Sequence, residues 1–159
     1  MNVRIIAVGK IKEPYLTQGL KEYSKRMGSY GRFEIKEIKE ESFSEPLSAK
    51  ELELILLREG ERIISELRPR SLVIALDRLG QLWTSEKLAA TMQKTALQGI
   101  SHVDFIIGGS LGLHSNVLKK ANHSLSFSKF TFPHQLMRLI LIEQIYRAFT
   151  IIAGERYHK

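Results

Sequence analysis

Three short runs of apolar, mostly β-branched residues alternate with segments of helical periodicity, and this alternation restricts the fold more than any other feature. The runs span residues 3–8, 72–76 and 103–107. Strands covered on both faces have this continuous apolar composition, and helical patterns between them are typical of βα units. The sequence therefore predicts a single α/β domain over residues 1–159, with a mostly parallel sheet flanked by helices. A more polar edge strand is expected at residues 33–39.

Local signals mark where the expected helices begin. One helical pattern starts at Pro14, a residue that is favoured in the first turn of a helix. Ser48 and Glu51 have the spacing of a capping box, in which each side chain satisfies a free backbone N–H group of the other residue. Thr84 or Ser85 is expected to cap a third helix.

Charge and composition limit the partners that the chain can have. Lys and Arg number 24 against 17 Asp and Glu, which gives a net charge of +7. Such a surplus attracts polyanions, including RNA, DNA and acidic membranes. No segment has the apolar length of a membrane span or of a signal peptide, so a cytoplasmic protein is expected. The chain has no cysteine, and its histidines lack zinc-like spacing, so no metal site is expected.

A glycine-rich turn follows the third apolar run. Residues 108–112 read Gly-Gly-Ser-Leu-Gly. Glycine has no Cβ, so a ligand can approach the backbone N–H and C=O groups of such a turn closely. The turn therefore predicts a bound small molecule.

The same five residues also fit G-x-S-x-G, the nucleophile elbow of α/β-hydrolases, with Ser110 as the nucleophile. A hydrolase triad needs an acid and a histidine further along the chain. The acids after Ser110 are Glu143, within an apolar helix, and Glu155. A serine hydrolase is consequently the least favoured interpretation.

The last predicted helix, which follows Pro133, is apolar on nearly all sides. A chain of 159 residues has little interior in which to cover such a helix, so the sequence predicts a homodimer. His134 and Arg138 lie in the first turns of this helix, where free N–H groups favour anions. Glu143 and Arg147 are four residues apart and are expected to form an ion pair.

Short motifs along the whole chain resemble those of one family. They are Ala7-Val8-Gly9-Lys10, Glu59-Gly60-Glu61-Arg62-Ile63, Val73-Ile74-Ala75-Leu76-Asp77 with Gly80, Ser85-Glu86-x-Leu88-Ala89, Phe105-Ile106-Ile107-Gly108-Gly109, Leu125-Ser126-x-Ser128, Thr131-Phe132-Pro133-His134-x-x-x-Arg138, Glu143-Gln144-x-Tyr146-Arg147-Ala148 and Tyr157-His158-Lys159. In this combination the chain resembles the small SPOUT-superfamily 23S ribosomal RNA pseudouridine N3-methyltransferases of the RlmH type. Leu111 departs from the pattern, since relatives often carry a polar residue there.

This resemblance implies a fold, a cofactor and a substrate. It implies an α/β fold with a C-terminal trefoil knot, a homodimer, and the binding of S-adenosylmethionine. The implied reaction is N3-methylation of a pseudouridine in the helix 69 loop of 23S ribosomal RNA on the ribosome. The implied cofactor contacts are Leu76, Gly108, Phe127, Ser128, Lys129, Phe130, Thr131 and Phe132. For Phe130 and Phe132, packing in the core is the alternative interpretation.

Methyl transfer from a sulfonium requires placement of the acceptor and stabilisation of its anion. The imide nitrogen of the uracil ring must also lose a proton, which a positioned cation or base assists. The candidates for these roles are Arg138, His134, Tyr157 and His158. Arg138 and His134 are expected to position RNA phosphate or base, and the C-terminal tail is expected to close over the site, from its own subunit or from the partner.

A non-catalytic RNA-binding module is the alternative function. The net charge of +7 is sufficient for such binding, because Lys and Arg neutralise phosphates and release counterions. The sequence shows neither the aromatic pair nor the GXXG loop of common RNA-binding modules. Binding of S-adenosylmethionine distinguishes the enzyme from the module.

Overall fold

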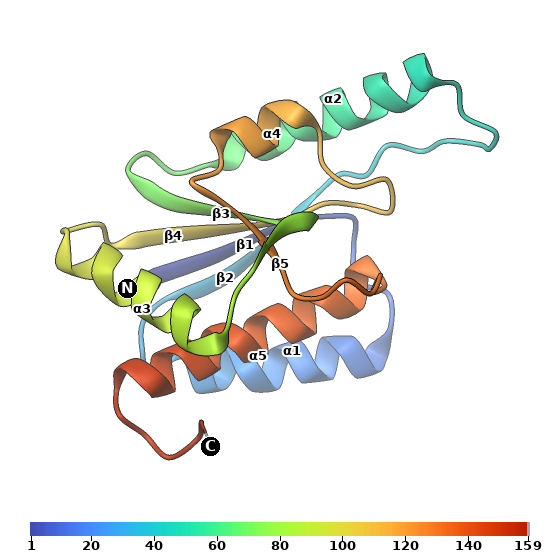
Figure 1. The fold of residues 1–159 in the computed structure, drawn as a ribbon. Coiled ribbons are helices and arrows are strands. Elements are labelled where there is room, and N and C mark those ends of the chain that lie inside the picture. Colours follow the sequence, from blue (N-terminus) through green and yellow to red (C-terminus); the bar gives the residue numbers. More distant parts are fainter. Residues whose placement is uncertain (159) are drawn as a thin grey trace.

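Strands and helices alternate along the chain, as the sequence predicts. The computed structural model describes residues 1–158. In that range the elements are β1 (Asn2–Val8), α1 (Pro14–Met27), β2 (Phe33–Ile38), α2 (Ala49–Glu66), β3 (Ser71–Leu82), α3 (Ser85–Leu97), β4 (His102–Ile107), α4 (Ser115–Lys120), β5 (His123–Ser126) and α5 (His134–Ile152) (Figure 1).

The five strands of residues 1–158 form one parallel sheet in the order β2-β1-β4-β3-β5. β1 and β4 lie next to each other in the interior of the sheet, which explains their continuous apolar sequences. β2 lies at one edge, as its polar sequence predicts. The predicted α/β fold with a parallel sheet is thus confirmed.

Helices cover both faces of the sheet. α1, α3 and α5 lie on one face, and α2 and α4 lie on the other (Figure 1). Successive side chains of a strand point to opposite faces. In β1, Val3, Ile5 and Ala7 therefore pack beneath α1 and α5, whereas Ile6 and Val8 pack beneath α2.

The predicted helix starts are confirmed. Pro14 opens α1, and Ser48 and Glu51 form both hydrogen bonds of a capping box at the start of α2. Thr84 caps α3 by accepting a hydrogen bond from the backbone N–H of Lys87. None of the helices in the described residues is both long and apolar enough to cross a membrane.

α5 is covered largely by its own chain. It lies between α1 and α3 and against the sheet (Figure 1), and each of its residues is buried or half-buried. Several apolar residues of the helix, among them Leu136, Leu139 and Ile140, nevertheless stay only half-buried. The homodimer therefore stays a prediction.

β3 and β5 differ from the sequence expectation. β3 continues to Leu82, beyond the predicted end at Leu76, and its register against β5 shifts between Leu76 and Gln81. At Gly80 the backbone passes so close to β5 that a Cβ would lie 2.6 Å from the carbonyl carbon of Ser124. The intervening residues 77–79 bulge from the sheet and reach the cavity described next.

Candidate functional site

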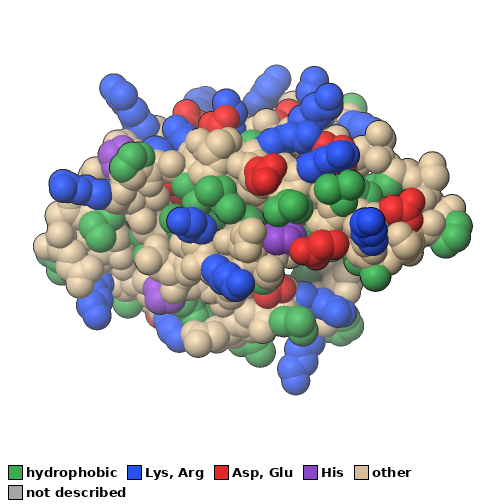
Figure 2. All heavy atoms as spheres, turned by 90° about the horizontal axis from the view of Figure 1, so that it is seen from above, with side chains coloured by type: hydrophobic (Ala, Val, Ile, Leu, Met, Phe, Trp, Pro, Cys, Tyr) green, Lys and Arg blue, Asp and Glu red, His purple; other side chains and the backbone are tan. Residues whose placement is uncertain are grey.

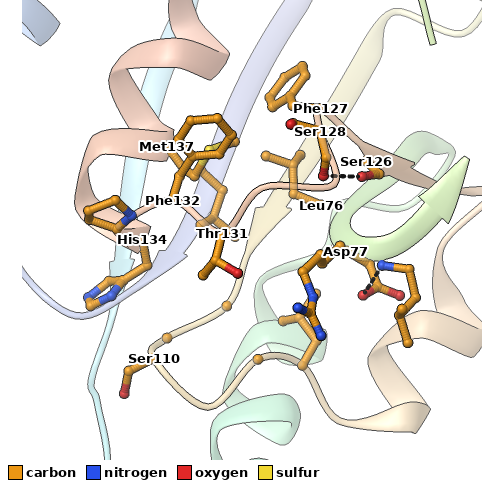
Figure 3. Close-up of a pocket in the computed structure, with 18 of the residues that line it drawn as sticks. Leu76, Asp77, Ser110, Ser126, Phe127, Ser128, Thr131, Phe132, His134 and Met137 are labelled. Atoms are coloured by element: carbon orange, nitrogen blue, oxygen red, sulfur yellow. Dashed lines mark hydrogen bonds between the residues drawn. The ribbon is translucent and has the colours of Figure 1, made fainter. Parts of the chain in front are cut away.

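A cavity of about 850 Å³ opens at the carboxyl ends of β3, β4 and β5 (Figure 3). In open parallel sheets, ligands bind at this end of the strands. The cavity is lined by residues 76–79, 107–113, 125–128 and 130–134, and by Met137 of α5. Three loops that are far apart in the sequence thus form one site.

The glycine turn is the wall contributed by β4. A Cβ on Gly108 would lie 2.5 Å from the carbonyl oxygen of Gly112, and the N–H of Gly112 donates to the oxygen of Gly109 at 3.1 Å. Gly112 has a φ of 92°, a conformation that favours glycine. The turn is therefore folded tightly on itself, and Gly108 makes room for the turn's own backbone rather than for a ligand.

The loop between β5 and α5, residues 127–133, is the opposite wall. Ser126 Oγ donates to the oxygen of Ser128 at 3.0 Å, and Ser128 Oγ accepts from the N–H of Phe130, also at 3.0 Å. Phe127 packs against the core, but Phe130 is 80% exposed and Phe132 is 37% exposed. Core packing, the alternative interpretation, is therefore wrong for Phe130.

Most of the residues implied as cofactor contacts meet at this cavity. Leu76, Gly108, Phe127, Ser128, Phe130, Thr131 and Phe132 line it. Lys129 is exposed and is not part of the lining. Asp77 and Leu79, which enter the cavity through the bulge of β3, are not among the residues that the sequence predicts for the site. Their position directly after a buried strand is the sequence signal that could have identified them.

His134 reaches the cavity from the first turn of α5 (Figure 3). Burial lowers the pKa of its imidazole, the carboxylate of Glu40 raises it, and the guanidinium of Arg138 lowers it. The net effect is a pKa below the usual range for histidine. A neutral imidazole at this wall can accept a proton.

Arg138 is placed differently from the expectation that it contacts RNA. Its side chain is fully buried and does not line the cavity. Its Nη2 donates to the backbone oxygens of Val8 and Gly9 at 2.8 Å and 2.7 Å, and its Nη1 donates to Glu37 Oε1 at 3.1 Å. In this structure the guanidinium is committed to the protein interior and cannot reach a phosphate.

Tyr157 and His158 follow α5, and the tail folds back along this helix. The Tyr157 hydroxyl donates to Glu143 Oε1 at 3.1 Å, and His158 Nε2 lies 2.8 Å from Glu86 Oε1. Glu143 lies near the middle of the 19-residue helix α5. Neither Tyr157 nor His158 lines the cavity of its own chain. Lys159 lies outside the described residues.

The predicted ion pair of α5 is confirmed, with Arg147 Nη2 2.6 Å from Glu143 Oε1.

The geometry gives no support to a serine hydrolase. Within residues 1–158 no hydrogen bond joins the hydroxyl of Ser110 to a histidine. His114, the nearest histidine in sequence, instead caps α4 and pairs with Glu53 at 2.7 Å. The same described residues contain no group of three His, Asp or Glu side chains that could hold a metal ion.

Comparisons with known proteins agree with the motifs. A family model described as "Predicted SPOUT methyltransferase" matches residues 1–158. The chain is 54% identical over 159 residues to the ribosomal RNA large subunit methyltransferase H of Bacillus pumilus (strain SAFR-032), and the match covers 100% of both chains.

A solved structure has a similar fold. It is a probable methylase family protein from Haemophilus influenzae Rd KW20, with a TM-score of 0.54 and 13% sequence identity, and the match covers 99% of this chain and 70% of that one. At this identity the similarity shows the fold alone. The family model and the full-length relative confirm the resemblance found in the motifs, and the chain belongs to the SPOUT methyltransferase family.

Proposed function

We propose that the cavity binds S-adenosylmethionine and that the chain methylates N3 of a pseudouridine in the helix 69 loop of 23S ribosomal RNA. The observation that carries the proposal is the meeting of the glycine turn, the bulge of β3 and the 127–133 loop around one cavity. Its volume, about 850 Å³, lies within the range of small-molecule sites, about 300–1,000 Å³.

The lining suits an adenosyl ligand. Leu76, Leu113 and Leu125 supply apolar surface for a purine ring, and the glycine turn and the 127–133 loop supply backbone donors and acceptors for its polar edge. These groups already line the cavity before the ligand binds, so binding costs little conformational entropy of the loops. When bound, S-adenosylmethionine supplies a methyl group with an electrophilic carbon.

His134 is the residue that we place closest to the acceptor base. The imidazole on the cavity wall, whose pKa is lowered, would accept the imide proton of the uracil ring. The nitrogen would then take the methyl group while the carbon–sulfur bond breaks and the sulfur leaves as the thioether of the demethylated product. Exposed Phe130 lies at the same cavity, where an aromatic ring can stack on an unpaired base.

The substrate and the assembly complete the proposal. The net charge of +7 favours ribosomal RNA, the substrate class in the name of the Bacillus pumilus relative. A protein with this substrate acts in the cytoplasm, with the ribosomes. On the α2 and α4 side of the molecule, Lys and Arg are scattered among acidic and apolar side chains (Figure 2). We infer that RNA is bound instead around the mouth of the cavity. The C-terminal trefoil knot and the homodimer belong to the same proposal.

Calorimetric titration with S-adenosylmethionine tests the proposal first. We expect binding by the purified wild-type protein in the presence of a chelator, and competition by the demethylated product. A protein that binds ribosomal RNA but neither of these two ligands would be the non-catalytic module. That result would refute the proposed enzyme.

A further inference from the structure

Arg138 is a charged side chain in the protein interior, where an unpaired charge is costly. Its exposed fraction is 0%. Among the described residues, its Nε is the only buried side-chain nitrogen or oxygen atom without a hydrogen-bond partner. The chain thus keeps a charged group where burial disfavours the charge. The contacts of the guanidinium indicate its role.

The guanidinium joins α5 to the ends of two strands. Val8 and Gly9, whose backbone oxygens accept from Nη2, lie at the carboxyl end of β1. Glu37, which accepts from Nη1, lies near the carboxyl end of β2 and also accepts from the N–H of Ile11 at 3.0 Å. One side chain thereby connects a helix to two neighbouring strands and to the loop that follows β1.

The same helix turn carries the wall of the cavity. His134 and Met137 line the cavity, and the 127–133 loop leads directly into α5. A further bond, from the N–H of Lys12 to Gln135 Oε1 at 3.3 Å, holds this turn against the loop after β1. The bond from Ser126, the last residue of β5, to Ser128 holds only the start of the 127–133 loop to the sheet, and the bond from Phe130 to Ser128 is internal to the loop. The end of the loop is held through the start of α5.

We propose that Arg138 is a positioning residue, which holds the start of α5, and with it the 127–133 wall and His134, against the carboxyl ends of β1 and β2. The identity of the ligand in this inference rests on the proposed function. The placement of the wall does not, because it follows from contacts within the chain, chiefly those of Arg138.

Substitution of Arg138 separates positioning from general stability. Arg138→Met keeps the length and apolar body of the side chain but removes the guanidinium, and Arg138→Lys keeps the charge. The matched control is Ile142→Ala, one turn along the same helix, where the side chain is equally buried but does not line the cavity. Each variant is compared with wild type for its urea unfolding midpoint and for S-adenosylmethionine affinity by calorimetry.

We expect Arg138→Met to lose about tenfold or more in affinity, and Arg138→Lys to regain part of the loss. Ile142→Ala should lower the urea unfolding midpoint about as much as Arg138→Met does. Its affinity for S-adenosylmethionine should nevertheless stay within about twofold of wild type. Wild-type affinity in folded Arg138→Met, or an equal loss in Ile142→Ala, would overturn the inference. If Arg138→Met does not fold, Glu37→Ala, at a partly exposed position, takes its place, because it removes the acceptor of both Arg138 Nη1 and the Ile11 N–H. Unchanged affinity in Glu37→Ala would then overturn the inference.

Hydrogen exchange provides a readout that needs no ligand. In Arg138→Met the backbone amides of residues 9–12 and 127–132 should exchange faster than in wild type, whereas those of Ile142→Ala should keep wild-type rates in these segments. Unchanged exchange in Arg138→Met would refute the positioning role even if the wild-type protein fails to bind S-adenosylmethionine. That failure of wild type, by itself, would refute only the proposed function.

Discussion

The imidazole of His134 is subject to burial and to two opposite charges, the carboxylate of Glu40 and the guanidinium of Arg138. Burial and Arg138 lower the pKa of this imidazole, whereas Glu40 raises it. Because the pKa is lowered overall, the neutral imidazole is favoured, and its protonation requires a lower pH than that of an ordinary histidine. We therefore expect kcat/KM for methyl transfer to be flat above the pKa of His134 and to fall below it.

His134→Asn tests the role of this residue. The variant should lose about tenfold or more in kcat and the acid limb of the pH profile, while S-adenosylmethionine affinity stays within about threefold of wild type. Arg138→Lys keeps the neighbouring charge and should keep the acid limb. An unchanged pH profile in His134→Asn would show that another group accepts the proton.

Gly108 is the residue at which the turn tolerates no side chain. In Gly108→Ala the new Cβ would lie 2.5 Å from the oxygen of Gly112, so the turn must open. We expect a loss of about tenfold or more in S-adenosylmethionine affinity, because displacement of the glycine turn by about 1 Å is enough to weaken its contacts with the ligand by this factor. The matched control is Gly99→Ala, remote in sequence from the cavity, where φ is 80° and a Cβ meets no atom within 4 Å. Gly99→Ala should lower the free energy of unfolding by about 1 kcal/mol and leave S-adenosylmethionine affinity unchanged. If Gly99→Ala also weakened binding, the effect of Gly108→Ala could not be assigned to the glycine turn.

Individual elements differ in how far the sequence predicts them. β1, β4 and α1 to α3 carry their own signals: continuous apolar runs, Pro14, and the caps at Ser48 and Thr84. β5 is four residues long, and of these only Leu125 is apolar, so nothing local identifies it. The extension of β3 beyond Leu76 depends on pairing with β5, which no window of the sequence contains.

The residues of the site also differ in how far the sequence predicts them. The loops at the cavity are predicted because the glycine turn and the motif residues are contiguous in the sequence. The burial of Arg138 is not, because its partners Gly9 and Glu37 lie 129 and 101 residues away. From the sequence alone, Arg138 has the features of a free cation at the start of a helix.

The end of α5 and the tail form a packed element that does not line the cavity. Tyr157 rests against the ring of Tyr146 and bonds to Glu143. If the tail acts in the site of a second subunit, deletion of residues 157–159 should leave S-adenosylmethionine affinity intact. Methyl transfer should fall about tenfold or more, which is about 1.4 kcal/mol in the transition state. Full activity in the deletion variant, measured by methyl incorporation into ribosomes, would remove the tail from the mechanism.

At the scale of the whole molecule, the arrangement of tail and cavity has a consequence for assembly. Tyr157 and His158 do not line the cavity of their own chain, so we place the tail in the cavity of a neighbouring chain. We therefore expect light scattering to give the mass of a dimer at micromolar concentration. Mixed dimers of a Gly108→Val chain and a tail-deleted chain should regain activity that neither parent has, because one intact cavity then meets one intact tail. Dimers that form but stay inactive would contradict a shared site.

Methyl transfer to ribosomes tests the central claim most directly. Ribosomes from cells that lack the corresponding enzyme are incubated with the purified protein and S-adenosylmethionine carrying a deuterated methyl group, and their RNA is analysed by mass spectrometry. We expect one labelled methyl group on a pseudouridine in the helix 69 loop of 23S RNA, and none when S-adenosylmethionine is omitted. An RNA without label, or label confined to a different nucleotide, would contradict the account.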